Sequence, residues 1–128
     1  MSENVKLTDV IQRDSRYAPA AYLFIFESLD FTIKKIGARR HVSGKELLEG
    51  IRENALRQFG ALAPMVFDQW GIKQCVDFGR IVFNLVESGL MGKTENDSID
   101  DFKEGYDFKE TFSFERASGR NAGEREQK

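Results

Sequence analysis

One long segment carries apolar side chains at helical spacing, and it constrains the fold more than any other feature. In YAPAAYLFIFESLDFTIKKIG, residues 17–37, apolar residues recur every three or four positions, so they line one face of an α-helix. Pro19 suits the first turn, where its missing N–H costs nothing, and Gly37 is typical just after the last turn. The pattern predicts a helix over residues 18–36 with an inner face of Tyr22, Ile25, Phe26, Leu29, Ile33 and Ile36.

Similar signals predict three further helices. Ser43 followed by Glu46 three residues later is the capping-box pattern of a helix start. Two shorter apolar segments end at glycines, and Asp77 is the expected N-cap of the second one. The predicted fold class is mainly α, a compact helical domain with at most a small β-hairpin after Gly89. The three helices are expected at residues 44–59, 62–70 and 77–89.

The chain has 128 residues, which fits a single domain. With 41% hydrophobic and 31% charged residues, the composition is that of a soluble globular protein. We expect an N-terminal arm or short helix over residues 1–16 and one globular helical domain over residues 17–114. Residues 115–128 carry no large apolar side chain and are expected to be a disordered tail.

Several function classes are disfavoured by what the sequence lacks. The first residues do not resemble a signal peptide, and no segment approaches the roughly 20 apolar residues of a membrane span. We therefore expect a cytoplasmic protein with no membrane partner. With one cysteine, Cys75, and one histidine, His41, the chain can form no internal disulfide, and we predict no metal or cofactor site. Cys75 is expected to be buried as a small hydrophobic residue.

Gly-Lys-Thr at residues 92–94 matches the end of a phosphate-binding loop. That motif also needs a glycine five positions before Gly92, where this chain has Glu87. It needs a preceding strand as well, whereas a predicted helix precedes it here. Nucleotide binding through this segment is therefore not expected.

Residues 63–98 resemble the helix-turn-helix core of winged-helix proteins, in which two helices are followed by Gly-Leu and a hairpin. In that interpretation Gly-Leu-Met-Gly-Lys-Thr leads into the hairpin. The outward face of the second helix would then carry Gly79, Arg80, Phe83, Asn84 and Glu87. Because Phe83 and Glu87 fit poorly against phosphates, we expect weak or no binding of duplex DNA.

Charge is divided between two parts of the chain. Residues 34–57 hold seven Lys and Arg against three Glu, and residues 95–110 hold seven Asp and Glu against two Lys. We expect the acidic segment to lie near the basic one, anchored to the core by Phe102, Tyr106, Phe108 and Phe112. The candidate contacts for a nucleic acid or another anion are Lys34, Lys35, Arg39, Arg40, His41, Lys45 and Arg80.

Three phenylalanines lie off the predicted inner faces: Phe24, Phe31 and Phe83. They are candidate contacts for a protein partner or a second copy, although a helix covered on two sides would bury them instead. The first functional hypothesis is therefore a small, non-enzymatic protein-interaction module, adaptor or regulator. The second is a winged-helix-type regulator that binds nucleic acid. An enzyme of unrecognised type ranks third, because no spaced catalytic set stands out.

Several segments also resemble one known family. They are RYAP with the following AY, then RHVSGKELLEGIR, QFG, WG, DFGRIVFNLVESGL and KTENDSIDDFKEGYDF, and together they span about residues 16–112. These segments are similar to a small bacterial family of uncharacterised proteins. The resemblance implies an intracellular bacterial protein, and it implies no activity, ligand or functional residue.

Overall fold

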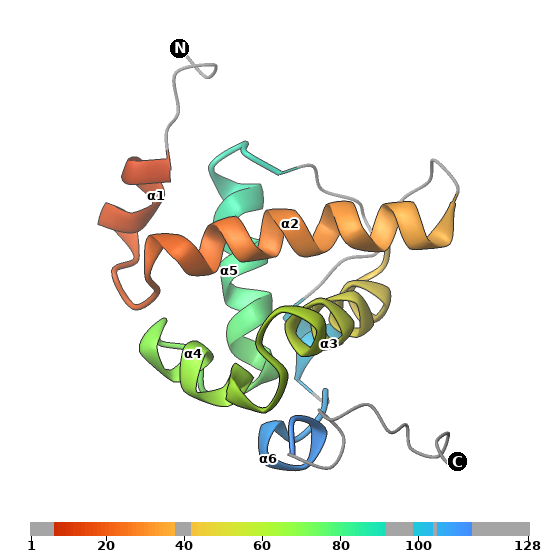
Figure 1. The fold of residues 1–128 in the computed structure, drawn as a ribbon. Coiled ribbons are helices and arrows are strands. Elements are labelled where there is room, and N and C mark those ends of the chain that lie inside the picture. The colour runs from red at the N-terminus through yellow and green to blue at the C-terminus, as the bar shows by residue number, and fades with distance from the viewer. Residues whose placement is uncertain (1–6, 38–41, 92–98, 104, 114–128) are drawn as a thin grey trace, which may run out of the picture.

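The chain is mainly helical, as predicted. The computed structural model describes residues 7–37, 42–91, 99–103 and 105–113, and within these ranges it contains helices and turns but no strand. Helix α2 crosses the middle of the molecule and packs against α3 and α5 (Figure 1). The elements in chain order are α1 (Leu7–Arg13), α2 (Pro19–Ile36), α3 (Gly44–Phe59), the 3₁₀ helix η2 (Gly60–Leu62), α4 (Ala63–Gln69), α5 (Cys75–Glu87), the 3₁₀ helix η3 (Ile99–Phe102) and α6 (Phe108–Thr111).

Helix α1 belongs to the same core as the helices that follow it. It packs against α2 and buries Val10. Of the two alternatives expected for residues 1–16, an arm or a short helix, the structure has a helix at Leu7–Arg13, and this helix packs with the others.

Helix α2 has nearly the predicted bounds, but its buried face is wider than the predicted stripe. Pro19 lies in the first turn, and Gly37 ends the helix with a φ of 75° and donates its N–H to the carbonyl of Ile33 at 3.0 Å. Because α3 and α5 both pack against α2, two sides of the helix face the core. The buried residues are Ala21, Tyr22, Phe24, Ile25, Ser28 and Thr32, whereas Phe26, Leu29, Ile33 and Ile36 are partly buried.

Phe24 lies in an aromatic cluster in the core, so its prediction as a partner contact is wrong. Its side chain is 4% exposed, and its ring centroid lies 5.7 Å from that of Phe59, 5.8 Å from that of Phe67 and 5.5 Å from that of Trp70. The ring faces α3 and α4, a side of α2 that a single apolar stripe does not include. Phe67 extends the cluster to Phe78, Phe108 and Phe112.

Helix α3 begins with the predicted capping box. Glu46 N donates to Ser43 Oγ at 3.1 Å, and Ser43 N donates to Glu46 Oε1 at 3.0 Å. Further along the helix, Gly50 faces α2 so closely that a Cβ there would lie 1.7 Å from Thr32 Oγ1 and 3.5 Å from the carbonyl oxygen of Ser28. A larger residue at position 50 would therefore force Thr32 to shift.

Helix α5 begins two residues earlier than predicted, and Asp77 is not its N-cap. Gln74 is the N-cap, and Asp77 is the third helical residue, which completes a capping box. The prediction that Gly79 faces outward is also wrong: it is buried against Phe102, and a Cβ on Gly79 would lie 2.9 Å from Phe102 Cδ1. Because aspartate is favourable both as N-cap and in the first turn, the sequence did not separate the two positions of Asp77.

The described part of the acidic segment is anchored by its aromatic residues, as predicted. Phe102, Phe108 and Phe112 are buried, and the Tyr106 hydroxyl donates to the carbonyl of Leu48 in α3 at 2.8 Å. Helix η3 packs on both α3 and α5. This segment therefore closes the core and lies beside α3, most of which falls within the basic region.

Some predictions fall outside the described residues. The Gly-Lys-Thr sequence and most of the proposed hairpin occupy residues 92–98, and Arg39, Arg40, His41 and the tail 115–128 are also outside. Just before the proposed hairpin, Leu90 N and Met91 N both donate to the carbonyl of Leu85 at the end of α5. The winged-helix resemblance stays a prediction.

Candidate functional site

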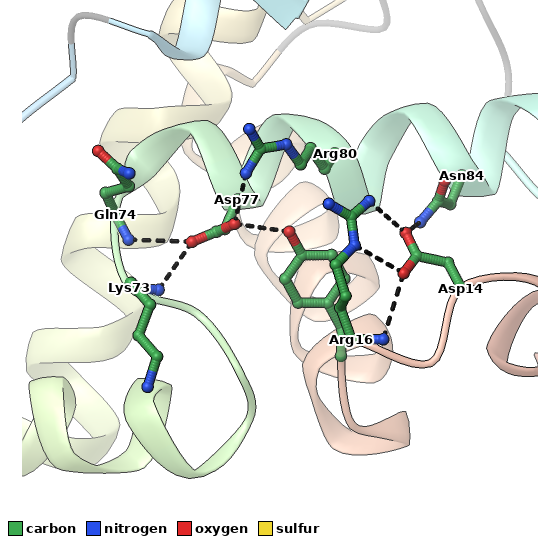
Figure 2. A network of polar contacts seen from close by, with 8 residues as sticks. Asp14, Arg16, Lys73, Gln74, Asp77, Arg80 and Asn84 are labelled. Carbon is green, nitrogen blue, oxygen red and sulfur yellow. Dashed lines mark hydrogen bonds and ion pairs between the residues drawn. The ribbon is translucent and has the colours of Figure 1, made fainter.

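Two carboxylates, the half-buried Asp14 and the buried Asp77, hold the connector between α1 and α2 in place against α5 (Figure 2). Asp14 accepts hydrogen bonds from Arg16 N, Nε and Nη2 at 3.2, 2.8 and 2.7 Å. It also accepts one from Asn84 Nδ2 at 2.8 Å, and Asn84 Nδ2 lies 3.1 Å from the hydroxyl of Tyr22. The hydrogen bonds from Arg16 hold the pKa of Asp14 well below its ordinary value, so this carboxylate stays ionised.

The second carboxylate, Asp77, accepts four hydrogen bonds. Oδ1 accepts from the Tyr17 hydroxyl at 2.6 Å and from Arg80 Nη1 at 2.9 Å, and Oδ2 accepts from Lys73 N at 2.8 Å and Gln74 N at 3.1 Å. Burial alone would raise the pKa of Asp77, but these hydrogen bonds outweigh burial and lower it. Burial and the bond to Asp77 raise the pKa of Tyr17 to about 12. Both groups therefore have structural roles and are poorly suited to proton transfer near neutral pH.

A groove of about 460 Å³ lies beside these networks. Helix α1 and the connector to α2 form one wall, and α5 forms the other. The residues that line it are Val10, Arg13, Asp14, Arg16, Phe83, Asn84 and Glu87. Its volume falls within the range of about 300–1,000 Å³ that is usual for ligand pockets.

The groove has an exposed aromatic ring and charges of opposite sign on its two walls. Phe83 is 53% exposed. Within the described part of the chain, neither Arg13 on α1 nor Glu87 on α5 forms an ion pair. Arg16 is bound to Asp14, yet its side chain stays 59% exposed, and its guanidinium lies 5.3 Å from the Tyr17 ring centroid. The α1 wall therefore presents positive charge, and the α5 wall presents a carboxylate beside the phenyl ring.

The lysines predicted to contact an anion at the end of α2 are engaged with carboxylates. Lys34 pairs with Asp30 one turn earlier at 3.0 Å, and Lys35 pairs with Glu53 on α3. Lys45 is exposed near the start of α3. The structure thus does not collect these lysines into one site.

Arg80 lies on α5, whereas those lysines lie on α2 and α3. It pairs with Asp77, and its side chain is 39% exposed. The remaining basic candidates, Arg39, Arg40 and His41, lie outside the described residues. A common anion site built from all the predicted cations is therefore not formed by the residues described.

The two remaining phenylalanine candidates differ in their surroundings. Phe31 is partly buried, and the Arg57 guanidinium of α3 lies 5.2 Å from its ring centroid. Phe83 is exposed and lines the groove.

The opposite wall of the groove, with Arg13, Asp14 and Arg16, was not predicted, because residues 1–16 were expected to be an arm or short helix outside the globular domain. The RDSR sequence at residues 13–16 was the available signal, since it places three charges in and beside a connector between two helices.

The described residues offer no evident reactive centre. Cys75 is buried as predicted, burial raises the pKa of its thiol to about 11, and its Sγ accepts a hydrogen bond from Tyr106 N at 3.3 Å. A thiol in this state is a poor nucleophile. No group of three or more His, Cys, Asp or Glu side chains in the described ranges is arranged to hold a metal ion. None of the helices described has both the length and the apolar character required to cross a bilayer.

Comparisons with protein-family models, with curated proteins and with solved structures found no match for this chain. The groove between α1 and α5 is therefore interpreted from its own geometry and charge.

Proposed function

We propose that the chain is a non-enzymatic protein-interaction module, a cytoplasmic adaptor or regulator, whose contact surface is the groove between α1 and α5. The observation that carries the proposal is the position of Phe83. Its aromatic ring is 53% exposed, and it lines the groove together with Arg13 and Arg16. Aromatic and arginine side chains together are typical of the residues that dominate protein interfaces.

The rigidity of the groove also supports this proposal. Asp14 and Asn84 tie the connector to α5, and Val10 of the same wall is buried in the core. The walls therefore need little ordering when a partner binds, which lowers the entropic cost of association. Arg13 and Glu87 can pair with charges of the partner without first breaking an ion pair within the described residues.

A nucleic-acid regulator remains the second candidate because α4 and α5 are consecutive helices joined by a short turn with Gly71 at a φ of 89°. If α5 were a recognition helix, Arg80 and Asn84 would have to reach bases while bound to Asp77 and Asp14. We expect at most weak binding of duplex DNA at physiological salt, measured by fluorescence anisotropy. A nanomolar, salt-sensitive affinity would favour this candidate instead.

Photo-crosslinking in the native cell tests the proposed function. A photoreactive phenylalanine analogue would replace Phe83 in one variant and Leu23 in a matched control, because Leu23 is 58% exposed on α2 outside the groove. We expect protein adducts from position 83 and few from position 23, and mass spectrometry would identify them. Absence of protein adducts at position 83, or equal adducts at both positions, would contradict the proposal.

A further inference from the structure

The surface around Phe83 combines a ridge with a groove. Phe83 and Glu87 are four residues apart on α5, so they lie on the same side of that helix and project together. Both also line the groove, whose far wall carries Arg13 and Arg16. The exposed side of α5 thus presents an aromatic ring and a negative charge, and we call it the α5 ridge; the facing wall of the groove carries Arg13 and, beside it, Arg16 paired with Asp14.

We infer that this surface binds a second copy of the same chain in a two-fold symmetric dimer. This inference rests on the proposed function and names its partner. The α5 ridge of each copy enters the groove of the other. Phe83 then packs in the partner's groove, and Glu87 lies against the second copy's arginine at position 13.

Charge complementarity favours a second copy over an unrelated protein. In a two-fold interface, each contact between two different residues occurs twice, so a surface must be complementary to itself. The α1 wall and the α5 wall satisfy this condition because they carry opposite charges that form no ion pair within the described residues: Arg13 on one and Glu87 on the other. In the dimer these two residues form two ion pairs, one on each side of the two-fold axis.

The dimer is expected to be weak. The patch has only seven lining residues, fewer than the roughly 20–30 residues on each side of a standard interface. Its occupancy should therefore depend on protein concentration. It should also fall as salt rises, because the charge pairs at the rim of the groove are screened.

Sedimentation velocity on the purified full-length chain, over about 1 µM to 1 mM, tests this inference with charge reversals. We expect the wild type to dimerise with rising concentration and Phe83→Ser to remain monomeric. Arg13→Glu alone places two like-charged pairs in the interface, and so does Glu87→Arg alone. Each should weaken the dimer roughly tenfold or more, since like charges that face each other disfavour association.

The decisive sample is an equimolar mixture of Arg13→Glu and Glu87→Arg. In a mixed dimer, the two introduced side chains face each other at one contact. They are the glutamate at position 13 of one copy and the arginine at position 87 of the other. The native Glu87 and Arg13 face each other at the second contact, so both pairs regain opposite charges. We expect the mixture to dimerise like the wild type although neither variant does so alone. Leu23→Ser is the matched control and should dimerise normally, and far-UV circular dichroism confirms that each variant is folded.

Three results would overturn the dimer: a wild type that stays monomeric throughout the range, a mixture that fails to associate, or a dimer that Leu23→Ser weakens as much as Phe83→Ser does. These results leave the proposed function standing if position 83 still crosslinks to a different protein in the cell. If position 83 yields no adduct at all, the proposed function fails with the dimer.

Discussion

Replacing Asp77 by asparagine tests how strongly the buried carboxylate joins the start of α2 to α5. The substitution keeps the shape of the side chain but exchanges one acceptor oxygen for an NH2 donor. In the native chain the carboxylate accepts from Tyr17, Arg80 and the backbone N–H groups of Lys73 and Gln74. In either orientation of the amide, its NH2 group takes the place of one carboxylate oxygen. It then faces the donors from which that oxygen accepted hydrogen bonds.

The expected loss of stability follows from these contacts. Losing a capping interaction costs about 1 kcal/mol, and a buried donor left without an acceptor costs about 1–3 kcal/mol. We expect Asp77→Asn to lower the free energy of unfolding by about 2–4 kcal/mol, the sum of the two effects. Tyr17→Phe removes one hydroxyl and leaves the carboxylate three donors, so its loss should be about 1 kcal/mol.

Urea unfolding followed by circular dichroism and by Trp70 fluorescence measures both losses. At about 1–3 kcal/mol per molar urea, a loss of about 3 kcal/mol lowers the midpoint by about 1 M or more. Asp68→Asn is a matched control, because Asp68 pairs with Lys73 at the surface and its side chain is 67% exposed; it should change stability little. If Asp77→Asn lowers the free energy of unfolding no more than Tyr17→Phe or this control does, the carboxylate does not stabilise the packing of α5 in the way that its hydrogen bonds indicate.

Three further predictions concern the rest of the core. The pKa values of Asp14 and Asp77 are lowered in the folded chain. These two carboxylates therefore stabilise the fold fully above the unfolded pKa of about 3.9, and this stabilisation is lost as pH falls through the folded pKa values. The free energy of unfolding should decrease below about pH 4, and it should decrease less steeply in Asp77→Asn. Gly50→Ala should destabilise by about 1–3 kcal/mol in thermal unfolding despite the higher helix propensity of alanine, because its Cβ would overlap Thr32, and a stabilised variant would show that α2 can move away. Cys75 should react with a thiol-specific reagent only as fast as the chain unfolds, because the thiol is buried and burial raises its pKa to about 11; rapid labelling of the folded protein would contradict this.

Local signals in the sequence predicted the helices well, since the residues that start and end a helix are close together in the chain. Ser43 and Glu46 form the predicted capping box, and Gly37 ends α2. The error at Asp77 is local, because aspartate suits both the N-cap and the first helical turn. What the sequence did not indicate is the hydrogen bond that Asp77 accepts from Tyr17, 60 residues away.

The candidate site was only half predictable, for the same reason. Phe83 was expected to be exposed because it lies off the apolar face of its helix, and it is. Arg13 was missed because its wall is held in place by the bond between Asp14 and Asn84, 70 residues apart. Phe24 was misjudged because periodicity identifies one face of a helix and does not count the neighbours that cover the others.

The aromatic core also determines when the protein can fold during its synthesis. Phe67 is surrounded by rings from both earlier and later segments. Its ring centroid lies 5.3 Å from that of Phe108 and 5.7 Å from that of Phe112, so these contacts form only after residues 108–112 have been synthesised. A nascent chain that ends before residue 108 therefore exposes this apolar surface inside the cell, where it is a target for chaperones. Stalled ribosomal chains of that length should be cleaved rapidly by protease, whereas the released protein should resist it.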